Sequence, residues 1–331
     1  MTLPPTDTFD LERADFELPD DELPGLVAEL VREHLQRDRE QPMRPHKTPQ
    51  ELAAALPIAL EGDARPWPEA FALLREVLAV TPSTSSRRFF NQLFGGRSGM
   101  ATLAELASVL ANSPMHTFKA SGVQVLIERA VLRRLGALAG MPDGDGLIAP
   151  GGSLSNFAAT VMARNHALPG AREHGMPGVR ATLYASALCH YSVRKAAGMA
   201  GLGRDGVRAV PTDADGRMDP HALARMIADD RAAGAVPVMI VATAGTTVLG
   251  AFDPVPAIAD VAAREGVWLH VDAAHAGSLL ICPEFRHFSK GVEHADSFCF
   301  NPHKWLLTNF DCDCFFTRDR GKFARPALGS R

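Results

Sequence analysis

Lys304 is the residue of this sequence with the clearest potential for covalent chemistry. It follows the apolar run Ser297–Asn301 and stands between Pro302 and Trp305. A lysine amine that apolar and aromatic neighbours remove from water has a lowered pKa, and its neutral form can make an imine with an aldehyde. A lysine without such a role extends its amine to solvent. The apolar and stiff surroundings of Lys304 favour the reactive interpretation.

Asp272 directly follows another apolar run, Val267–Val271. A carboxylate there is costly unless a cationic group meets it. The position is consistent with a helix N-cap, with a structural ion pair, or with a carboxylate that keeps a pyridinium nitrogen protonated. His270 and His275 flank Asp272, but only His270 shares its strand face, because His275 lies in the following turn. We therefore predict no metal site.

A glycine-rich segment, Pro150–Asn156, opens a predicted helix and is a candidate phosphate site. Glycines such as Gly152 let the backbone approach a ligand, and the N–H groups of a helix start, with the hydroxyls of Ser153 and Ser155, suit a phosphate. The same residues are also typical of an ordinary loop with an N-cap. His190 begins another predicted helix, where its ring is either structural or stacks on a flat ligand.

The elements that position these residues alternate between short apolar runs and helical windows. This alternation predicts an α/β fold with a mostly parallel sheet covered by helices. Ligands bind beyond the carboxyl ends of the strands in such sheets, where His190, Asp272 and Lys304 are expected. The predicted strands are Leu147–Ala149, Ala181–Ala185, Val207–Val210, Val236–Ala242, Val267–Val271 and Ser297–Asn301, and the predicted helices are Ser155–Asn165, Tyr191–Ala200, Pro220–Ala233 and Pro254–Glu265.

Residues 1–85 are rich in proline and charge, and they predict a helical arm rather than a domain, with helices such as Leu23–Arg37 and Pro68–Val80. Residues 86–331 are predicted to form one large domain. Near its start, apolar positions recur at helical spacing between Ala101 and Leu138. This spacing predicts two packed helices.

The composition excludes several classes of partner. The 331 residues are 46% hydrophobic and carry a formal net charge of -4, so there is no basic surplus to attract nucleic acid or an acidic membrane surface. No segment has the pattern of a signal peptide or of a membrane span. The five cysteines suit reduced thiols. We expect a cytoplasmic protein without nucleic-acid or membrane partners.

Four motifs together resemble the group II pyridoxal-phosphate decarboxylases, a family that includes the glutamate, cysteine-sulfinate, aromatic-amino-acid and histidine enzymes. The motifs are His190–Lys195, Gly245–Thr247, Val271–Ala274 and Asn301–Lys304, and the resemblance covers roughly residues 85 to 320. It implies the pyridoxal-phosphate fold type I, similar to the large domain of aspartate aminotransferase. It also implies a homodimer that acts on an amino acid.

The resemblance implies a role for each matching residue. Lys304 would hold pyridoxal 5'-phosphate as a Schiff base, Asp272 would pair with the pyridine nitrogen, and His190 would stack on the ring, so these three are the predicted catalytic residues. Ala274 would pack on the opposite ring face, and Thr246 would lie near the phenolic oxygen. The full predicted cofactor-binding set is Gly152, Ser153, Ser155, His190, Thr246, Asp272, Ala274, Asn301, His303 and Lys304.

The substrate is predicted less directly. Arg88–Phe94 resembles the substrate strip of the glutamate and cysteine-sulfinate enzymes, which makes Gln92 the candidate specificity residue and favours a small acidic or sulfinic amino acid. Ala273–Asp313 is closer to the aromatic-amino-acid branch. Family members continue beyond the lysine with a mobile loop and a C-terminal domain, so we expect this chain, which stops at Arg331, to bind cofactor with weak turnover.

Two other classes of protein are consistent with parts of the sequence. Ser192–Lys195 fits the S-x-x-K pattern of serine acyl-transfer enzymes, but the K-T-G motif that accompanies it is missing. A non-catalytic protein that keeps the cofactor fold for binding or dimerisation is the second alternative.

Overall fold

A computed structural model of the chain describes residues 17–40, 47–57, 65–91 and 93–319. The chain divides into two compact units, Met1–Asn91 and Gln92–Arg331. The division lies close to the predicted boundary between residues 85 and 86, but it does not show which part folds alone. The predicted domain assignment therefore stays a prediction.

The first unit consists of three described helices. They are α1 (Leu23–Glu40), α2 (Pro49–Ala55) and α3 (Trp67–Val80), and none of their described residues is buried. Helix α2 begins with a capping box, in which Thr48 Oγ1 accepts from the Glu51 N–H at 3.2 Å and Glu51 Oε2 accepts from the Thr48 N–H at 2.7 Å. This pair satisfies two backbone donors at the start of a short helix.

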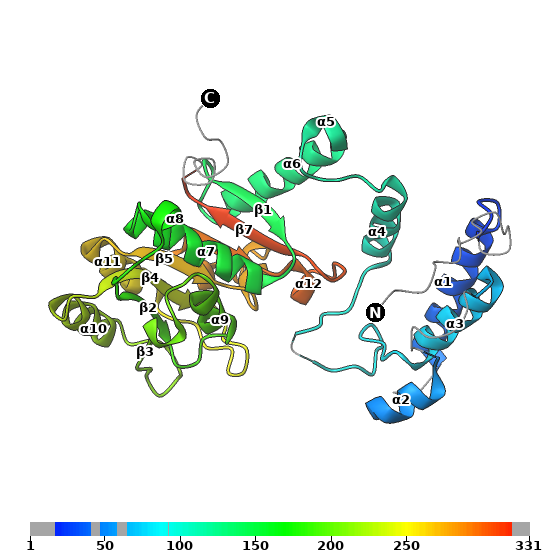
Figure 1. Cartoon of the computed structure of the whole chain (residues 1–331), viewed down its shortest axis with the longest axis horizontal. Helices are drawn as coiled ribbons and strands as arrows, with labels where there is room; N and C mark the ends of the chain where they lie inside the picture. Colours follow the sequence, from blue (N-terminus) through cyan, green and yellow to red (C-terminus); the bar gives the residue numbers. More distant parts are fainter. Residues whose placement is uncertain (1–16, 41–46, 58–64, 92, 320–331) are drawn as a thin grey trace, which may run out of the picture. The chain divides into compact units, whose positions relative to one another are not determined.

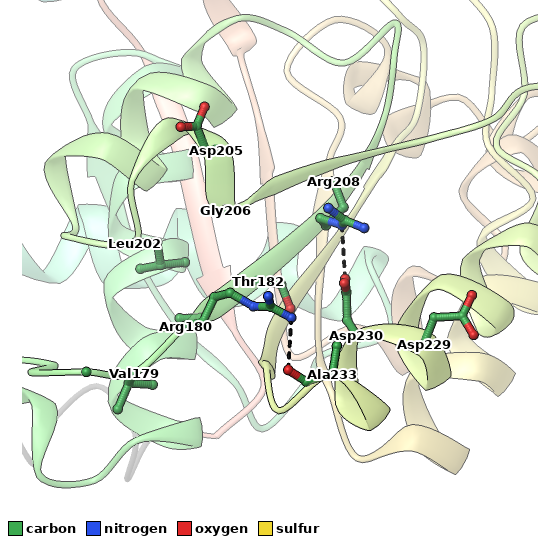
Figure 2. Close-up of a pocket in the computed structure, with 12 residues that line it drawn as sticks. Val179, Arg180, Thr182, Leu202, Asp205, Gly206, Arg208, Asp229, Asp230 and Ala233 are labelled. Carbon is green, nitrogen blue, oxygen red and sulfur yellow. Dashed lines mark hydrogen bonds and ion pairs between the residues drawn. The ribbon is translucent and has the colours of Figure 1, made fainter.

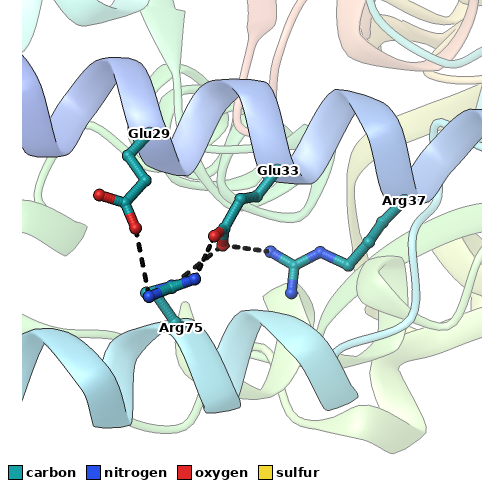
Figure 3. A network of polar contacts seen from close by, with 4 residues as sticks. All are labelled: Glu29, Glu33, Arg37 and Arg75. Carbon is teal, nitrogen blue, oxygen red and sulfur yellow. Dashed lines mark hydrogen bonds and ion pairs between the residues drawn. The ribbon is translucent and has the colours of Figure 1, made fainter.

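Helices α1 and α3 are joined by charged side chains (Figure 3). Arg75 of α3 donates from Nε to Glu33 Oε2 at 3.0 Å, and its Nη1 lies 3.2 Å from Glu29 Oε1. Arg37 Nη2 is 3.8 Å from the same Glu33 carboxylate. Exposed ion pairs of this kind are screened by solvent, so they orient the two helices more than they stabilise them.

The second unit is built on a seven-stranded sheet with the order β1-β7-β6-β5-β4-β2-β3. Strands β3, β2, β4, β5 and β6 are parallel, and β7 runs antiparallel to both β1 and β6. The prediction of a mostly parallel sheet is confirmed. The strands are β1 (Asp145–Ala149), β2 (Ala181–Ser186), β3 (Val207–Val210), β4 (Val236–Thr243), β5 (Trp268–Asp272), β6 (Ser297–Phe300) and β7 (Asp313–Thr317).

Helices cover both faces of this sheet (Figure 1). Alternate residues of β4 show why: Met239 and Val241 pack with α7 and α9, whereas Ile240 and Ala242 pack with α10 and α11. Strands buried on both faces are apolar throughout, as these are. The helices are α4 (Gly99–Ala111), α5 (Phe118–Ser121), α6 (Val123–Leu138), α7 (Gly152–Ala167), α8 (Ala171–His174), α9 (Ser192–Met199), α10 (Pro220–Ala232), α11 (Val255–Glu265) and α12 (Pro302–Trp305).

Helices α4 and α6 form where the apolar spacing predicts them, but the prediction that both are packed through these apolar positions is wrong. The apolar residues that define the pattern are exposed: Leu103, Leu106, Val109 and Leu110 in α4, and Val123, Leu126, Ile127 and Val131 in α6. Helix α6 instead buries Val125 and Leu132, and Leu132 belongs to the core beside the sheet. Helical spacing identifies an apolar face, but it does not identify what covers that face.

Candidate active site

A cavity of about 330 Å³ lies where the carboxyl ends of the strands meet. Strands β2, β4, β5 and β6 end at this edge, and β1 delivers the start of α7 to the same place. The expectation that the chemistry lies just beyond the strand ends agrees with this arrangement. Around the cavity the structure brings together Gly152, Ser153, His190, Asp272, Ala274, Asn301, His303 and Lys304.

Two residues of the predicted site do not line the cavity, and a third lies outside the described residues. Ser155 is buried in α7, where its hydroxyl donates to the Asp313 carboxylate. Thr246 is also buried, and its Oγ1 accepts from the Ala251 N–H at 3.0 Å, while the next residue, Thr247, lines the cavity. Gln92 lies outside the described residues. The roles predicted for these three residues stay predictions.

Lys304 lies in the single turn α12, which follows β6 directly. Pro302 starts this turn because its fixed φ suits the first helical position. Burial lowers the pKa of the Lys304 amine below its ordinary value, and the negative charge of Asp272 acts in the opposite direction. A larger share of the amine is therefore neutral at a given pH, which is the form that can attack an aldehyde.

Asp272 is the last residue of β5 and is almost fully buried. Its Oδ1 accepts from the Ala274 N–H at 3.0 Å, and its Oδ2 accepts from Asn156 Nδ2 at 2.8 Å. The Cys299 thiol also donates to Oδ1, at 3.9 Å. Hydrogen bonds from neutral donors thus hold the carboxylate in place, and Lys304 is the cation that lines the same cavity. Such a carboxylate can meet a further cationic group in the cavity.

A chain of hydrogen bonds leads to the Asp272 carboxylate from the far end of its strand. The Trp268 indole N–H, which can only donate, is 2.9 Å from Ser297 Oγ. The Ser297 hydroxyl is then free to donate to His270 Nδ1 at 2.9 Å, and His270 Nε2–H donates to Asn156 Oδ1 at 2.9 Å. Burial lowers the pKa of His270 to about 4, so its ring is neutral, and both ring nitrogens are engaged. His270 therefore has no lone pair for a metal.

The same chain continues from Asn156 to His190. Asn156 Nδ2 donates both to Asp272 Oδ2 and to Ser192 Oγ, the latter at 2.9 Å. The Ser192 hydroxyl in turn donates to His190 Nδ1 at 2.7 Å. His190 therefore carries its hydrogen on Nε2, and burial lowers its pKa below the ordinary value. One neutral chain thus orients both the carboxylate and the imidazole of the cavity.

Replacement of Asn156 tests this chain through stability. We expect Asn156→Ala to lower the free energy of unfolding by about 2–3 kcal/mol, because it leaves buried Asp272, Ser192 and His270 atoms unpaired. The measurement is chemical denaturation followed by circular dichroism. Asn165→Ala, near the carboxyl end of the same helix, is the matched control and should change the value by less than about 1 kcal/mol. Equal effects of the two replacements would contradict the chain.

The opposite end of the cavity is formed by the start of α7. Gly151 has a φ of 87° and precedes the first helical residue, Gly152. A Cβ atom on Gly152 would lie 3.1 Å from Ala274 Cβ and 3.1 Å from Asn301 Oδ1, so only glycine leaves this space open. Helix starts with open space in front of them suit phosphate groups. A flat aldehyde with a phosphate tail fits the complete set of groups in this cavity.

A larger cavity of about 670 Å³ lies near the amino ends of β2 and β3 (Figure 2). Its charged side chains serve the fold: Arg208 Nε pairs with Asp230 at 3.0 Å, and Arg180 Nη2 donates to the Ala233 carbonyl at 3.2 Å. Tyr184 also donates to Asp230 at 2.9 Å. No lysine, cysteine, serine or histidine is among its described lining residues. Size alone therefore does not identify the reactive cavity.

Several residues of the reactive cavity's surroundings were not predicted. Asn156 lies within the glycine-rich segment, and a polar residue in the buried first turns of a helix was a usable signal. The sequence pointed to Ser192 only as part of an S-x-x-K motif, and to His270 only as a possible metal ligand; neither pattern predicts a hydrogen bond in this chain. Asp313 could not be predicted from the rule that ligands bind after the ends of parallel strands, because it is the first residue of the antiparallel strand β7.

Comparison with known proteins agrees with this geometry. Residues 49–327 match the family model described as "Pyridoxal-dependent decarboxylase conserved domain". The chain is 41% identical to the cysteine sulfinic acid decarboxylase of Homo sapiens over 286 residues, which make up 86% of this chain and 58% of the relative. It thus spans less than two thirds of that relative's length.

Solved structures show the same fold. The crystal structure of mouse CSAD superposes with a TM-score of 0.89 at 37% identity, over 94% of this chain and 68% of that one. The structure of Oryza sativa TDC with PLP and tryptamine gives a TM-score of 0.86 at 32% identity, over 95% of this chain and 67% of that one. The fold and the family resemblance predicted from the sequence are both confirmed. The chain belongs to the pyridoxal-dependent decarboxylase family.

Proposed function

We propose that the chain removes the α-carboxyl group of an L-amino acid as carbon dioxide, with pyridoxal phosphate held at Lys304. The observation that carries this proposal is the meeting of a partly buried lysine and a rigidly held aspartate, Asp272, in one cavity with an open helix start. Pyridoxal phosphate, when bound, supplies an aldehyde for amines and a ring that accepts the electron pair left by departing carbon dioxide.

The residues of the chain have separate tasks in this proposal. Lys304 offers an amine that loses its proton more readily, because burial lowers its pKa. Asp272 would hold a proton on the ring nitrogen, since all of its hydrogen-bond donors are neutral groups and it keeps a negative charge to offer. His190 presents an uncharged ring with its hydrogen on Nε2, and Ala274 limits the opposite side of the cavity. Gly152 keeps the helix start open for a phosphate.

We propose a small acidic or sulfinic amino acid as substrate. The support is the 41% sequence identity to a protein named cysteine sulfinic acid decarboxylase. Among the solved structures, the identity is 37% to mouse CSAD and 32% to the TDC that was solved with tryptamine. Gln92 remains the proposed specificity residue, on the basis of the sequence alone. A substrate carboxylate or sulfinate would need a hydrogen-bond donor on the open side of the cavity, and a glutamine amide provides one.

A substrate panel tests this function. Carbon dioxide release is measured with cysteine sulfinate, glutamate, aspartate, tryptophan and dihydroxyphenylalanine. We expect release from the acidic and sulfinic compounds first. Release from the aromatic compounds alone would favour the aromatic alternative. Cofactor loading without release from any compound would favour the non-catalytic alternative, and a colourless chain that cleaves esters would favour a serine enzyme.

We also propose that the protein is a cytoplasmic homodimer. All five cysteines are free thiols, which suits a reducing compartment. No helix in the described part of the chain combines the length and the apolar character that a membrane span requires. The uncovered apolar faces of α4 and α6 support self-association, since a monomer rarely leaves so many large apolar side chains in water.

The dimer can be tested on the exposed face of α6. We expect Ile127→Asp to shift the protein from dimer to monomer in sedimentation velocity, because a charge in an apolar interface is costly to desolvate. Arg129→Asp, on the other side of α6, is the matched control and should leave the dimer intact. An unchanged sedimentation coefficient for Ile127→Asp would remove this face from the interface.

A further inference from the structure

Asp313 is a buried carboxylate beside the cavity, and the proposed function gives Asp313 no role. It is the first residue of β7, and because β7 runs antiparallel, Asp313 lies at the sheet edge where the parallel strands end, opposite Ala149 of β1. Its side chain is fully buried. Oδ1 accepts from the Ser155 hydroxyl of α7, and Oδ2 has no hydrogen-bond partner.

The unpaired oxygen faces the wall of the cavity at the start of α7. A Cβ atom on Gly152 would lie 3.5 Å from Asp313 Oδ2 and 3.1 Å from one terminal atom of the Asn301 amide, so the two side chains approach the same point. Gly152 and Asn301 line the cavity. Asp313 therefore lies directly behind the part of the wall that suits a phosphate.

The orientation of the Asn301 amide connects Asp313 to this wall. The Cys312 N–H donates to His303 Nδ1 at 3.0 Å, so a neutral His303 carries its hydrogen on Nε2. The Asn301 amide atom 3.1 Å from Nε2 must then accept, which makes it the oxygen. The amide atom that approaches Gly152 is then the NH2 group. In this orientation the Asn301 oxygen has a donor, and the NH2 group lies near the point that Asp313 Oδ2 also approaches.

The charges around Asp313 disfavour its ionised form. Lys304 is the only lysine or arginine among the described residues that line the cavity, whereas Asp272 and Asp311 both line it. The groups that act on Asp313 are Ser155 of α7, Asp272 of β5, Cys299 of β6, Lys304 of α12, and Cys312 and Cys314 on either side of it. Burial, with Asp272 and Cys312, raises the pKa of Asp313 to about 8, against the Ser155 hydrogen bond and Lys304.

We propose that Asp313 is a positioning residue that acts as a neutral carboxylic acid, and that binding of the cofactor's phosphate group is coupled to protonation of Asp313. The inference rests on the proposed function, because it needs the phosphate at the start of α7. In the neutral form one oxygen carries the proton and donates to Ser155 Oγ, and the other accepts from the Asn301 NH2 group. Above the pKa of Asp313, each bound phosphate therefore takes up one proton.

The test compares pyridoxal 5'-phosphate with pyridoxal, which lacks the phosphate. Dissociation constants of both compounds are measured by absorbance from about pH 7 to about pH 9.5, a range in which the phosphate, with a second pKa of about 6, is already a dianion. Effects of Lys304 on binding are common to both compounds and cancel in the ratio of the two constants. We expect the preference for the phosphorylated compound to fall about tenfold per pH unit above about pH 8.

Asp313→Asn imitates the neutral acid, since an amide offers one donor and one acceptor. We expect this variant to keep its preference for the phosphorylated compound and to lose the dependence on pH. Asp311→Asn, which removes an exposed carboxylate of the same cavity, is the matched control and should keep the wild-type slope. Calorimetry in two buffers gives a second readout that needs no variant, namely the number of protons taken up on binding. Near pH 9 we expect one more proton to be taken up when pyridoxal phosphate binds than when pyridoxal binds.

The outcomes separate this inference from the proposed function. A wild-type preference that does not change with pH, or equal proton uptake for the two compounds, would overturn the role of Asp313 and leave the cofactor site intact. A wild-type slope that persists in Asp313→Asn would also overturn it. Absence of any preference for the phosphorylated compound would instead overturn the proposed cofactor site.

Discussion

Borohydride reduction after loading with pyridoxal phosphate is expected to leave the cofactor attached to Lys304 and to no other lysine. Lys304 is the lysine that lines the strand-end cavity, and burial lowers its pKa. Lys195 and Lys290 are exposed, and the Lys195 amine lies 4.4 Å from the centre of the Tyr191 ring. Among the lysines that the structure describes, Lys304 is the one that combines a lowered pKa with a cavity for the ring.

The attachment is measured by mass spectrometry of peptides after reduction and digestion. Lys304→Arg should abolish the adduct and the visible absorbance band together, because a guanidinium does not form the imine. Lys195→Arg is the matched control and should retain a stoichiometric adduct. An adduct on Lys195 or Lys290 in the wild-type chain would show that the assignment of Lys304 is wrong.

Asp272→Asn is expected to leave the cofactor attached but to slow carbon dioxide release strongly. An amide cannot hold a ring nitrogen protonated, since it lacks the negative charge that favours the pyridinium form. Loss of an opposite charge lowers the pKa of a neighbouring cationic group by about 1–3 units, so we expect the rate to fall on the order of tenfold to a thousandfold. The rate is measured with the best substrate of the panel.

Two controls separate the charge of Asp272 from its packing. Borohydride trapping of the Asp272→Asn variant should still label Lys304, which shows that the site is assembled. Asp311→Asn removes a carboxylate from the exposed side of the same cavity and should change the rate by less than about tenfold. Full activity of Asp272→Asn would mean that Asp272 is structural.

The placement of His190, Asp272 and Lys304 around one cavity was predictable because parallel strands deliver their last residues to a single edge of the sheet. That rule needs only the order of runs and helices, which apolar patterning supplies. The rule applies to residues that follow parallel strands, so it does not predict site residues that begin an antiparallel strand. Asp313 reaches the same edge from the opposite direction, which only the pairing of β7 with β1 and β6 reveals.

The support behind the cavity was less predictable. The chain from Trp268 through His270 to Asn156 depends on the rotation of α7 about its axis and on the register of β5 with β6. Neither quantity follows from the spacing of apolar residues. The exposed faces of α4 and α6 show the same limit, since the pattern determines which residues share a face but says nothing about the surface that meets it.

The position of β1 in the sheet has a consequence for synthesis on the ribosome. Strand β1 precedes the six other strands in the chain, yet it joins the sheet only through β7, the last of them. Until Thr317 has left the ribosome, β1 lacks its partner and β6 presents an unpaired apolar edge. Unpaired edges of this kind readily pair with other chains. A nascent chain of this protein therefore depends on protection from aggregation until its last strand emerges, and Asp145 meets Thr317 only then.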